Sequence, residues 1–243
     1  FGVGYYSLQS PPHNPRLHKE LYPEMLDEIS LADQMGFDSA WLTEHHFLED
    51  GYCPSSLVAA AAIAARTKKV RIGTGVLLMP LHDPVRVAED AAVVDLISGG
   101  RLILGIGLGY RPEEFAGFGR ALKERRGRME ESIEILQKGW ADEPFSFDGT
   151  YYKLENTSIT PKPVQKPVPI WIGAFTEPAI RRAARIGAPL YVPAIGTIPI
   201  IKYLFDMHAR LLQEYGRNPE DFEKPLVREI YISDQKADAT WEK

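Results

Sequence analysis

Two adjacent histidines beside a carboxylate form the part of the sequence best suited to acid–base chemistry. Glu44, His45 and His46 directly follow residues 39–43, which have the pattern of a short buried strand. Histidine gains or loses a proton near neutral pH, and a neighbouring carboxylate can fix which ring nitrogen carries that proton. The structural alternative is that one histidine ends the strand and the other faces solvent. Neighbours on an extended segment point to opposite sides and no third ligand is evident, so we predict no metal site.

A run of glycines ends the segment 101–106 and could bring a ligand close to the backbone. Gly107 and Gly109 are followed by Tyr110, and glycine lets a planar ligand or a phosphate approach the main chain. The run is not a dinucleotide-binding motif, because no glycine stands at the required third position and Arg111-Pro112 is not expected to begin a good helix. Glycines that only make room in a crowded barrel are an equally good explanation.

A third segment joins a strand to a helix and has the composition of an anion-binding turn. Between the strand 170–172 and a helix that holds Pro178 in its first turn stand Gly173, Ala174, Phe175 and Thr176. Backbone N–H groups at a helix N-terminus bind anions, and barrels often carry phosphate sites after their later strands. Positive charge could come from Arg125, Arg126 and Arg128. The structural alternatives are a helix cap at Thr176 and ordinary surface arginines. We expect Glu177 to point outward.

The elements that must position these residues alternate between strands and helices. Apolar patterning predicts strands over residues 1–6, 39–43, 70–79, 101–106, 170–172, 190–192 and 226–232. It predicts helices over residues 21–35, 54–66, 84–97, 124–140, 178–186 and 200–215. Strict alternation implies parallel strands joined by right-handed crossovers. Polar or glycine-rich residues follow nearly every strand, which favours a (β/α)8 TIM barrel over an open, doubly wound sheet.

We predict a single α/β barrel domain over residues 1–243 that is incomplete at its C-terminal end. Residues 111–168 interrupt the alternation and are interpreted as an insertion that contains a charged helix and a small β-hairpin over 145–156. The pattern ends before an eighth βα unit, so we predict that this unit is missing from the chain. The first residue is Phe1 and not methionine, so we also expect residues before it.

Composition excludes several classes of protein. The chain has a single cysteine, Cys53, which excludes an internal disulfide framework and multi-cysteine metal centres and predicts a cytoplasmic location. The net charge of -5 argues against a surface that binds nucleic acid phosphates. The longest apolar stretch, 56–65, is too short to cross a bilayer, and no signal peptide is recognisable. We therefore predict neither nucleic-acid binding nor membrane insertion.

Several short stretches, collinear over nearly the whole chain, form a recognisable set. They cover residues 40–47, 72–75, 79–90, 98–101, 105–107, 113–115, 118–119 and 169–173. In this order and spacing they resemble the bacterial luciferase-like, flavin-dependent monooxygenase family. The resemblance implies a TIM barrel that binds reduced FMN, adds O2 to it to form a C4a-peroxyflavin, and oxygenates a small organic substrate.

The resemblance also implies roles for individual residues. His45 is the candidate catalytic histidine, held by Glu44 or a neighbour, and His46 belongs to the same shell. The bond between Gly75 and Val76 falls where family members have a non-proline cis peptide against the isoalloxazine. The cofactor and substrate pocket would be lined by Gly107, Gly109 and Tyr110. The FMN phosphate would be held by Ala174, Phe175 and Thr176, with Gly173 beside them. Glu114 matches an acidic position near the mouth of the pocket.

Two positions depart from the family pattern and weaken the expected hold on the FMN phosphate. Leu108 stands where light-emitting members have an arginine, and Ala179 replaces a second hydroxyl on the phosphate-binding helix. Arg125 or Arg126 would then supply the compensating charge. The modest affinity that results predicts a separate flavin reductase that supplies FMNH2.

The family resemblance further implies a homodimer. The helices 55–66 and 84–97 would form its interface, with Glu89 near the centre. Their alanine-rich faces would allow the close approach of helices that such an interface needs.

Two other functions stay open. An oxidoreductase that uses the deazaflavin F420 shares the fold and transfers hydride instead of oxygen, although Glu44-His45-His46 favours FMN. A non-catalytic flavin-binding protein is the second alternative. The presence of Glu44 and His45 and of the polar segments after the predicted strands argues against this second alternative.

Overall fold

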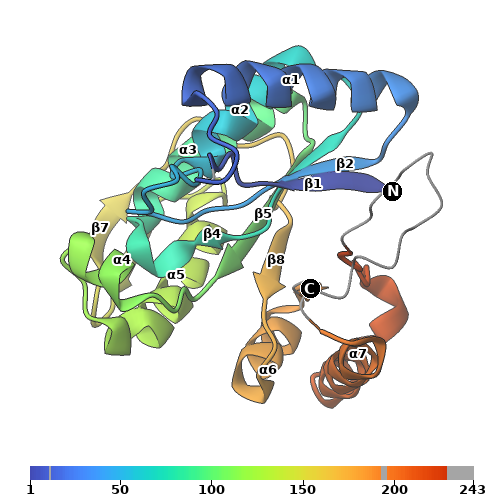
Figure 1. The fold of residues 1–243 in the computed structure, drawn as a ribbon. Coiled ribbons are helices and arrows are strands. Elements are labelled where there is room, and N and C mark those ends of the chain that lie inside the picture. The colour runs from blue at the N-terminus through green and yellow to red at the C-terminus, as the bar shows by residue number, and fades with distance from the viewer. Residues whose placement is uncertain (11, 193–195, 229–243) are drawn as a thin grey trace.

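The computed structural model describes residues 1–10, 12–192 and 196–228 (Figure 1). Its parallel strands lie side by side in the order β1 (Gly2–Tyr6), β2 (Ser39–Leu42), β3 (Arg71–Thr74), β5 (Leu102–Gly107), β8 (Ile170–Gly173) and β9 (Leu190–Tyr191). The short strand β4 (Leu77–Leu78) pairs with β5. Because the order in the sheet follows the order in the chain, the arrangement is that of a barrel wall and not of a doubly wound sheet, whose order reverses.

The helices that the periodicity predicts are all present within three residues of their predicted starts. They are α1 (His18–Met35), α2 (Ser56–Arg66), α3 (Pro84–Ser98), α5 (Arg125–Gly139), α6 (Glu177–Ile186) and α7 (Ile198–Glu214). Local chemistry explains why α3 begins and ends where it does. Asp83 accepts hydrogen bonds from the first free N–H groups, Pro84 opens the helix, and Gly99 ends it with a positive φ of 67°. In Figure 1, α1, α2 and α3 line one side of the strands.

Three predictions about the strands and helices need correction. Arg111-Pro112 does begin a helix, α4 (Pro112–Gly117), which proline at its first position and two acidic residues in its first turn favour. This helix is too short to produce a periodic pattern. The predicted strand 70–79 is divided into β3 and β4 around the cis peptide Gly75-Val76. Of the predicted strand 226–232, Leu226 forms an isolated bridge with Val192, and residues 229–232 lie outside the described residues.

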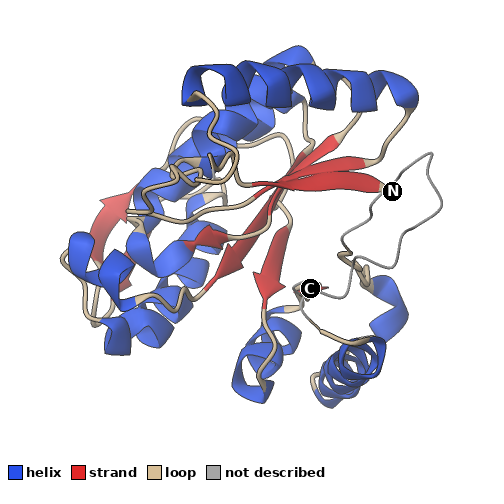
Figure 2. Ribbon diagram, viewed as in Figure 1, coloured by secondary structure: helices blue, strands red, loops and turns tan. Residues whose placement is uncertain are grey.

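The segment 111–168 contains α4, the 3-10 turn η2 (Leu122–Glu124), α5 and the antiparallel hairpin of β6 (Phe145–Asp148) and β7 (Lys153–Thr157). This confirms the predicted hairpin, which stands apart from the parallel sheet in Figure 2. The carboxylate of Glu131 on α5 accepts the N–H groups of Thr150, Tyr151 and Tyr152 at the hairpin turn. The hairpin is therefore anchored to α5, whose first residues reach the edge of the site described below.

The main hydrophobic core lies between the strands and the helices that cover them. Fully buried side chains of this core come from both layers, among them Ile29, Ile63, Ile72, Leu104 and Leu136. Their burial stabilises the strand ends from which the loops of the site project. Two further short turns, η1 (Met79–Leu81) and η3 (Pro219–Asp221), complete the described elements. Within those elements, every helix is too short or too polar to cross a membrane.

Candidate functional site

A cavity of about 400 Å³ opens at the carboxyl ends of the parallel strands. Pockets for small ligands have volumes of about 300–1,000 Å³, so its size suits a small molecule. Most of the predicted site residues lie on its wall: Glu44, His45, Gly75, Val76, Gly107, Gly109, Tyr110, Arg125, Gly173, Ala174, Phe175 and Thr176. His46, Glu114 and Arg126 are not among its lining residues. The loops after β2, β3, β5 and β8 thus converge on one space, as the barrel topology requires.

His45 is oriented by a carboxylate far away in the sequence. Its Nδ1 lies 2.8 Å from Oε1 of Glu114, which also accepts the backbone N–H of His46 at 2.9 Å. The rings of Tyr52 and Tyr110 stand edge-on to the imidazole, with centroids at 4.8 and 5.7 Å. Because Nδ1 is engaged, Nε2 is the ring nitrogen that His45 can offer to a ligand in the cavity. The carboxylate that holds His45 is Glu114 and not the adjacent Glu44.

Glu114 lies at a different depth from the one expected. The resemblance puts it near the mouth of the pocket, whereas its side chain is fully buried behind His45. It sits in the first turn of α4, the helix that periodicity could not reveal. Its Oε2 has no hydrogen-bond partner among the described residues, and Nε of Arg111 is 3.9 Å from its Oε1, too far for a hydrogen bond. Glu114 therefore acts on the cavity only through His45.

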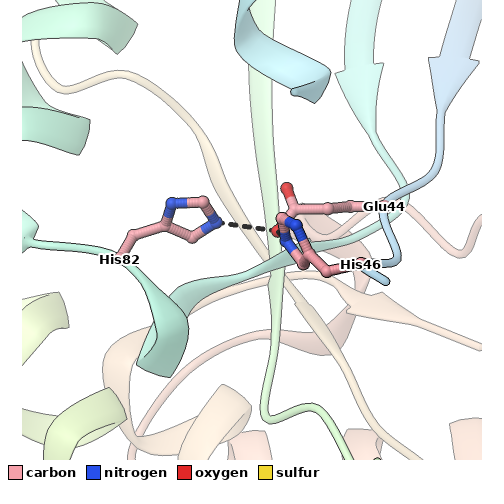
Figure 3. Close-up of side chains that lie close together, drawn as sticks. All are labelled: Glu44, His46 and His82. Carbon is pink, nitrogen blue, oxygen red and sulfur yellow. Dashed lines mark hydrogen bonds and ion pairs between the residues drawn. The ribbon is translucent and has the colours of Figure 1, made fainter. Parts of the chain in front are cut away.

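Glu44 is the centre of a second cluster, which lies just after β2 (Figure 3). Its Oε1 accepts hydrogen bonds from Nε2 of His82 at 2.7 Å, from Nε2 of His46 at 3.1 Å and from the N–H of Leu78 at 3.3 Å. Its Oε2 accepts the hydroxyl of Ser56 at 3.0 Å. Figure 3 shows both imidazoles turned toward this carboxylate. Glu44 and His45 both line the cavity, whereas His46 does not.

These hydrogen bonds decide the charge of Glu44. Burial alone would raise the pKa of its carboxyl group, but the hydrogen bonds and electrostatic attraction of His46 and His82 outweigh burial and lower it to about 2. Glu44 is therefore a buried, ionised carboxylate at neutral pH. Within the described ranges, neither a lysine nor an arginine forms an ion pair with it.

The same cluster overturns one statement made from the sequence, that no third ligand stands near the histidine pair. The oxygen of Glu44 and one ring nitrogen each of His46 and His82 all lie within 4.8 Å of one another, a set that could hold a metal ion. His82 follows η1 and reaches the cluster across 38 positions of sequence. It lies within the stretch 79–90 on which the family resemblance rests, directly after a predicted strand. That position in the sequence could have indicated His82 as a site residue. For Ser56 the sequence indicates only the start of a helix.

The glycines at the strand ends serve Val76, which forms part of the cavity wall. A Cβ on Gly107 would come within 2.5 Å of one methyl group of Val76, and a Cβ on Gly173 within 2.9 Å of the other. Larger residues at either position would push Val76 into the cavity. Both glycines therefore make room for a neighbouring side chain, and for Gly107 this is the structural explanation that the sequence left open.

One end of the cavity has the features of an anion site. It is lined by Thr176, the residue before α6, whose side chain makes no capping hydrogen bond to that helix. Arg125, the first residue of α5, also lines this cavity, and its side chain has neither an ion pair nor a hydrogen bond with another described residue. Arg126 is exposed and lies away from the wall. Glu177 points to solvent and pairs with Arg181, as expected. Leu108 and Ala179, the two departures from the family pattern, line the cavity as well.

Comparison with known proteins identifies the family of this chain. The family model of luciferase-like monooxygenases matches residues 5–242. The chain belongs to the luciferase-like monooxygenase family. Within it, the oxygenase component of a flavin-dependent trigonelline monooxygenase from Acinetobacter baylyi is 29% identical over 231 residues, which are 91% of this chain and 62% of that protein.

Relatives with a different cofactor in their name are equally close. An F420-dependent glucose-6-phosphate dehydrogenase from Amycolatopsis mediterranei is 38% identical over 172 residues, 68% of this chain and 51% of that protein. Among solved structures, the monooxygenase RslO1 from Streptomyces bottropensis superposes with a TM-score of 0.83 at 30% identity, over 90% of this chain and 67% of that one. The luciferase-like chain thus spans about half to three fifths of the length of these curated relatives.

Proposed function

We propose that this luciferase-like chain provides the flavin site of a monooxygenase that uses reduced FMN and O2 to oxygenate a small organic substrate. The observation that carries the proposal is the pair of His45 and Glu114. A 2.8 Å hydrogen bond fixes Nδ1 of the imidazole and leaves Nε2 for the cavity. This arrangement holds or delivers a proton at one defined atom beside a bound ligand.

The cavity fits reduced FMN in size and in the chemistry of its wall. Val76, Leu78 and Leu108 give it an apolar side, against which a planar ring system can pack. Arg125 and the N-terminus of α6 offer positive charge to a phosphate group. The flavin supplies the redox and oxygen chemistry when it is bound, whereas the residues of this chain bind it, orient it and exclude water.

The aromatic rim supports an organic substrate. Tyr110 and Phe175 line the cavity and remain 67% and 63% exposed, so each presents a ring face or edge at the opening. A substrate that covers these rings would remove them from water and narrow the opening. The rim therefore favours a substrate with an apolar body.

A separate reductase that supplies FMNH2 is part of the proposal. Leu108 and Ala179 lie on the cavity wall without an anion-binding group, which leaves Arg125 as the cation among the lining residues. A site of this kind releases its cofactor more readily than one with a second arginine. The trigonelline relative is itself named as an oxygenase component, in keeping with two-component chemistry.

We further propose a homodimer through α2 and α3. Large apolar side chains remain exposed on these two helices: Val58, Val93, Leu96 and Ile97, at 41% to 73%. Exposed apolar side chains gathered on neighbouring helices mark association surfaces. Light scattering after gel filtration should give twice the chain mass, and the double substitution Val93→Lys and Ile97→Lys should give the monomer mass with an unchanged circular dichroism spectrum. A monomeric native chain would contradict this interface.

F420-dependent hydride transfer is the second candidate, favoured by the 38% identity to an F420-dependent dehydrogenase. Oxygen-free titrations with FMNH2 and with reduced F420, followed by protein fluorescence, separate the two. We expect saturable, tighter binding of FMNH2. On mixing with O2, the bound flavin should re-oxidise more slowly than free flavin, and His45→Ala should lose this delay while it still binds.

The possible outcomes are distinct. Tighter binding of reduced F420 would assign the second candidate in place of the first. Binding of FMNH2 with a re-oxidation rate equal to that of free flavin would indicate the non-catalytic alternative. Absence of saturable binding by either cofactor would contradict every flavin-based function proposed for the chain.

A further inference from the structure

Two histidine side chains are directed at the same carboxylate oxygen of Glu44. Two imidazole Nε2 atoms, from His46 and His82, are aimed at the same carboxylate oxygen, at 3.1 and 2.7 Å (Figure 3). They come from two separate segments, one after β2 and one after η1. All three candidate ligand atoms lie within 4.8 Å of one another. Side chains from distant positions therefore point at one small volume.

The surroundings of Glu44 suit a positive charge. Glu44 is buried, with 3% of the residue exposed, and the side chains that form ion pairs with it in the described part of the chain are the two histidines. A buried carboxylate is stable only when a cation or several hydrogen-bond donors offset the loss of water. Four hydrogen-bond donors already offset the burial of Glu44, and this carboxylate together with two neutral imidazoles can in addition coordinate a metal cation.

The donor set selects the kind of metal. Two histidine nitrogens and one carboxylate oxygen form the protein part of many open zinc sites and suit other first-row divalent ions. Bonds of about 2.0–2.2 Å place neighbouring ligands of a tetrahedral zinc ion about 3.3–3.5 Å apart. The separations of 2.7 and 3.1 Å would have to widen by about 0.2–0.8 Å, while the three atoms, which lie within 4.8 Å of one another, take up the same spacing. His82 can make this movement because a quarter of its side chain, 26%, is exposed.

The groups around the cluster would hold the ligands in place. The Ser56 hydroxyl binds the second oxygen of Glu44, and the Leu78 N–H binds the first. Such supporting hydrogen bonds orient ligating carboxylates in known metal sites. Nδ1 of His46 and Nδ1 of His82 have no hydrogen-bond partner among the described side chains and backbone groups. Each ring can therefore carry its proton on Nδ1 and present the lone pair of Nε2 to a metal.

We propose that Glu44, His46 and His82 form a binding site for one divalent transition-metal ion, with Zn²⁺ as the expected occupant. The site lies beside the flavin cavity, whose wall it shares through Glu44. It uses other side chains than the pair of His45 and Glu114, to which it is linked by the hydrogen bond from the backbone N–H of His46 to Glu114. The proposal does not depend on the flavin chemistry and is tested without flavin.

The experiment is calorimetric titration of the whole chain, freed of metal by dialysis against a chelator, with ZnCl2. We expect one ion per chain with a micromolar or lower dissociation constant. Titration with Co²⁺ should give the visible absorption of a four- or five-coordinate ion. Saturating Zn²⁺ should also raise the melting temperature by several degrees, because the ion binds the folded chain and not its dispersed ligands.

The decisive variants are His82→Gln and His46→Gln. The glutamine amide N–H can replace the imidazole Nε2–H in the bond to Glu44, but a glutamine is a poor zinc ligand. Each variant should therefore fold and should bind Zn²⁺ at least about 30-fold more weakly. His13→Gln removes an exposed histidine elsewhere and is the matched control, with unchanged affinity.

Two results would overturn the proposal. The first is the absence of saturable zinc binding below millimolar concentration in the native chain, which would show that the three side chains do not form a zinc site. The second is equal affinity in the native chain and in His82→Gln, which would place the bound ion on the surface. Because His82 is partly exposed, the His82→Gln measurement stands even if His46→Gln does not fold.

Discussion

Two buried carboxylates flank the end of β2, and they are satisfied in different ways. Glu44 accepts four hydrogen bonds on its two oxygens, from two imidazoles, a hydroxyl and a backbone N–H. Glu114 accepts two, both on Oε1, and its Oε2 has no hydrogen-bond partner among the described groups. The first carboxylate joins three segments of the chain. The second serves mainly one imidazole that faces the cavity.

This difference shows that burial by itself does not reveal what a carboxylate does. Both side chains are nearly inaccessible, at 3% and 0%. A carboxylate with all its hydrogen bonds made stabilises the structure or holds a cation. A carboxylate that has an oxygen without a hydrogen bond and lies behind a histidine acts mainly on that histidine. The two groups should therefore respond differently to substitution, one mainly in stability and the other mainly in activity.

The largest expected effect is on stability. Glu44→Ala leaves four donors without their acceptor and should lower the free energy of unfolding by about 4 kcal/mol, as for a broken buried ion pair. Glu114→Ala removes fewer bonds and should cost about 2 kcal/mol. Urea unfolding followed by circular dichroism measures both. Glu134→Ala, which removes an exposed pair with Lys138, is the control and should change stability by less than about 0.5 kcal/mol. Equal losses for Glu44→Ala and Glu114→Ala would contradict the comparison.

The second effect is a dependence of stability on pH. The folded-state pKa of Glu44 is about 2, below its ordinary value of 4.5, so the ionised form contributes stability that is complete above about pH 4.5. That contribution, on the order of 3 kcal/mol, is lost as the pH falls from about 4.5 toward 2. Urea midpoints of chelator-treated protein between these limits should fall more steeply for the native chain than for Glu44→Gln. Parallel curves would show that Glu44 does not titrate with folding.

The third effect separates activity from stability. His45→Ala and Glu114→Gln should each reduce the flavin-dependent activity by about 100-fold, because both remove the oriented Nε2. The double variant should be no more than about threefold worse than either single one, as expected for residues that act as a unit. Steady-state oxygen consumption with an added reductase measures all three. A double variant with the product of both losses would mean that Glu114 acts independently of His45.

The smallest expected effect comes from removing the hydroxyl that donates a hydrogen bond to Glu44. Ser56→Ala removes the bond to Oε2 and should cost about 1–2 kcal/mol of unfolding free energy, with no change in flavin binding. Thermal melts and the fluorescence titration check the two parts. A change in flavin affinity without a loss of stability would place Ser56 with the cavity and not with the Glu44 cluster.

Local patterns in the sequence predicted most of the fold. The strands and the long helices follow from apolar periodicity and from capping residues such as Asp83 and Gly99, which act within a few positions. The short helix α4 escaped prediction because six residues make no periodic pattern. The burial of Glu114 was not predicted either, because it depends on where α4 packs.

The sequence by itself determined that Glu44, His45 and His46 stand together just after a strand. Only the tertiary structure decided their partners. His45 meets Glu114 across 69 positions, and Glu44 meets His82 across 38. The physical reason is that hydrogen bonds between loops depend on how strands and helices pack, and neither periodicity nor local propensity carries that information.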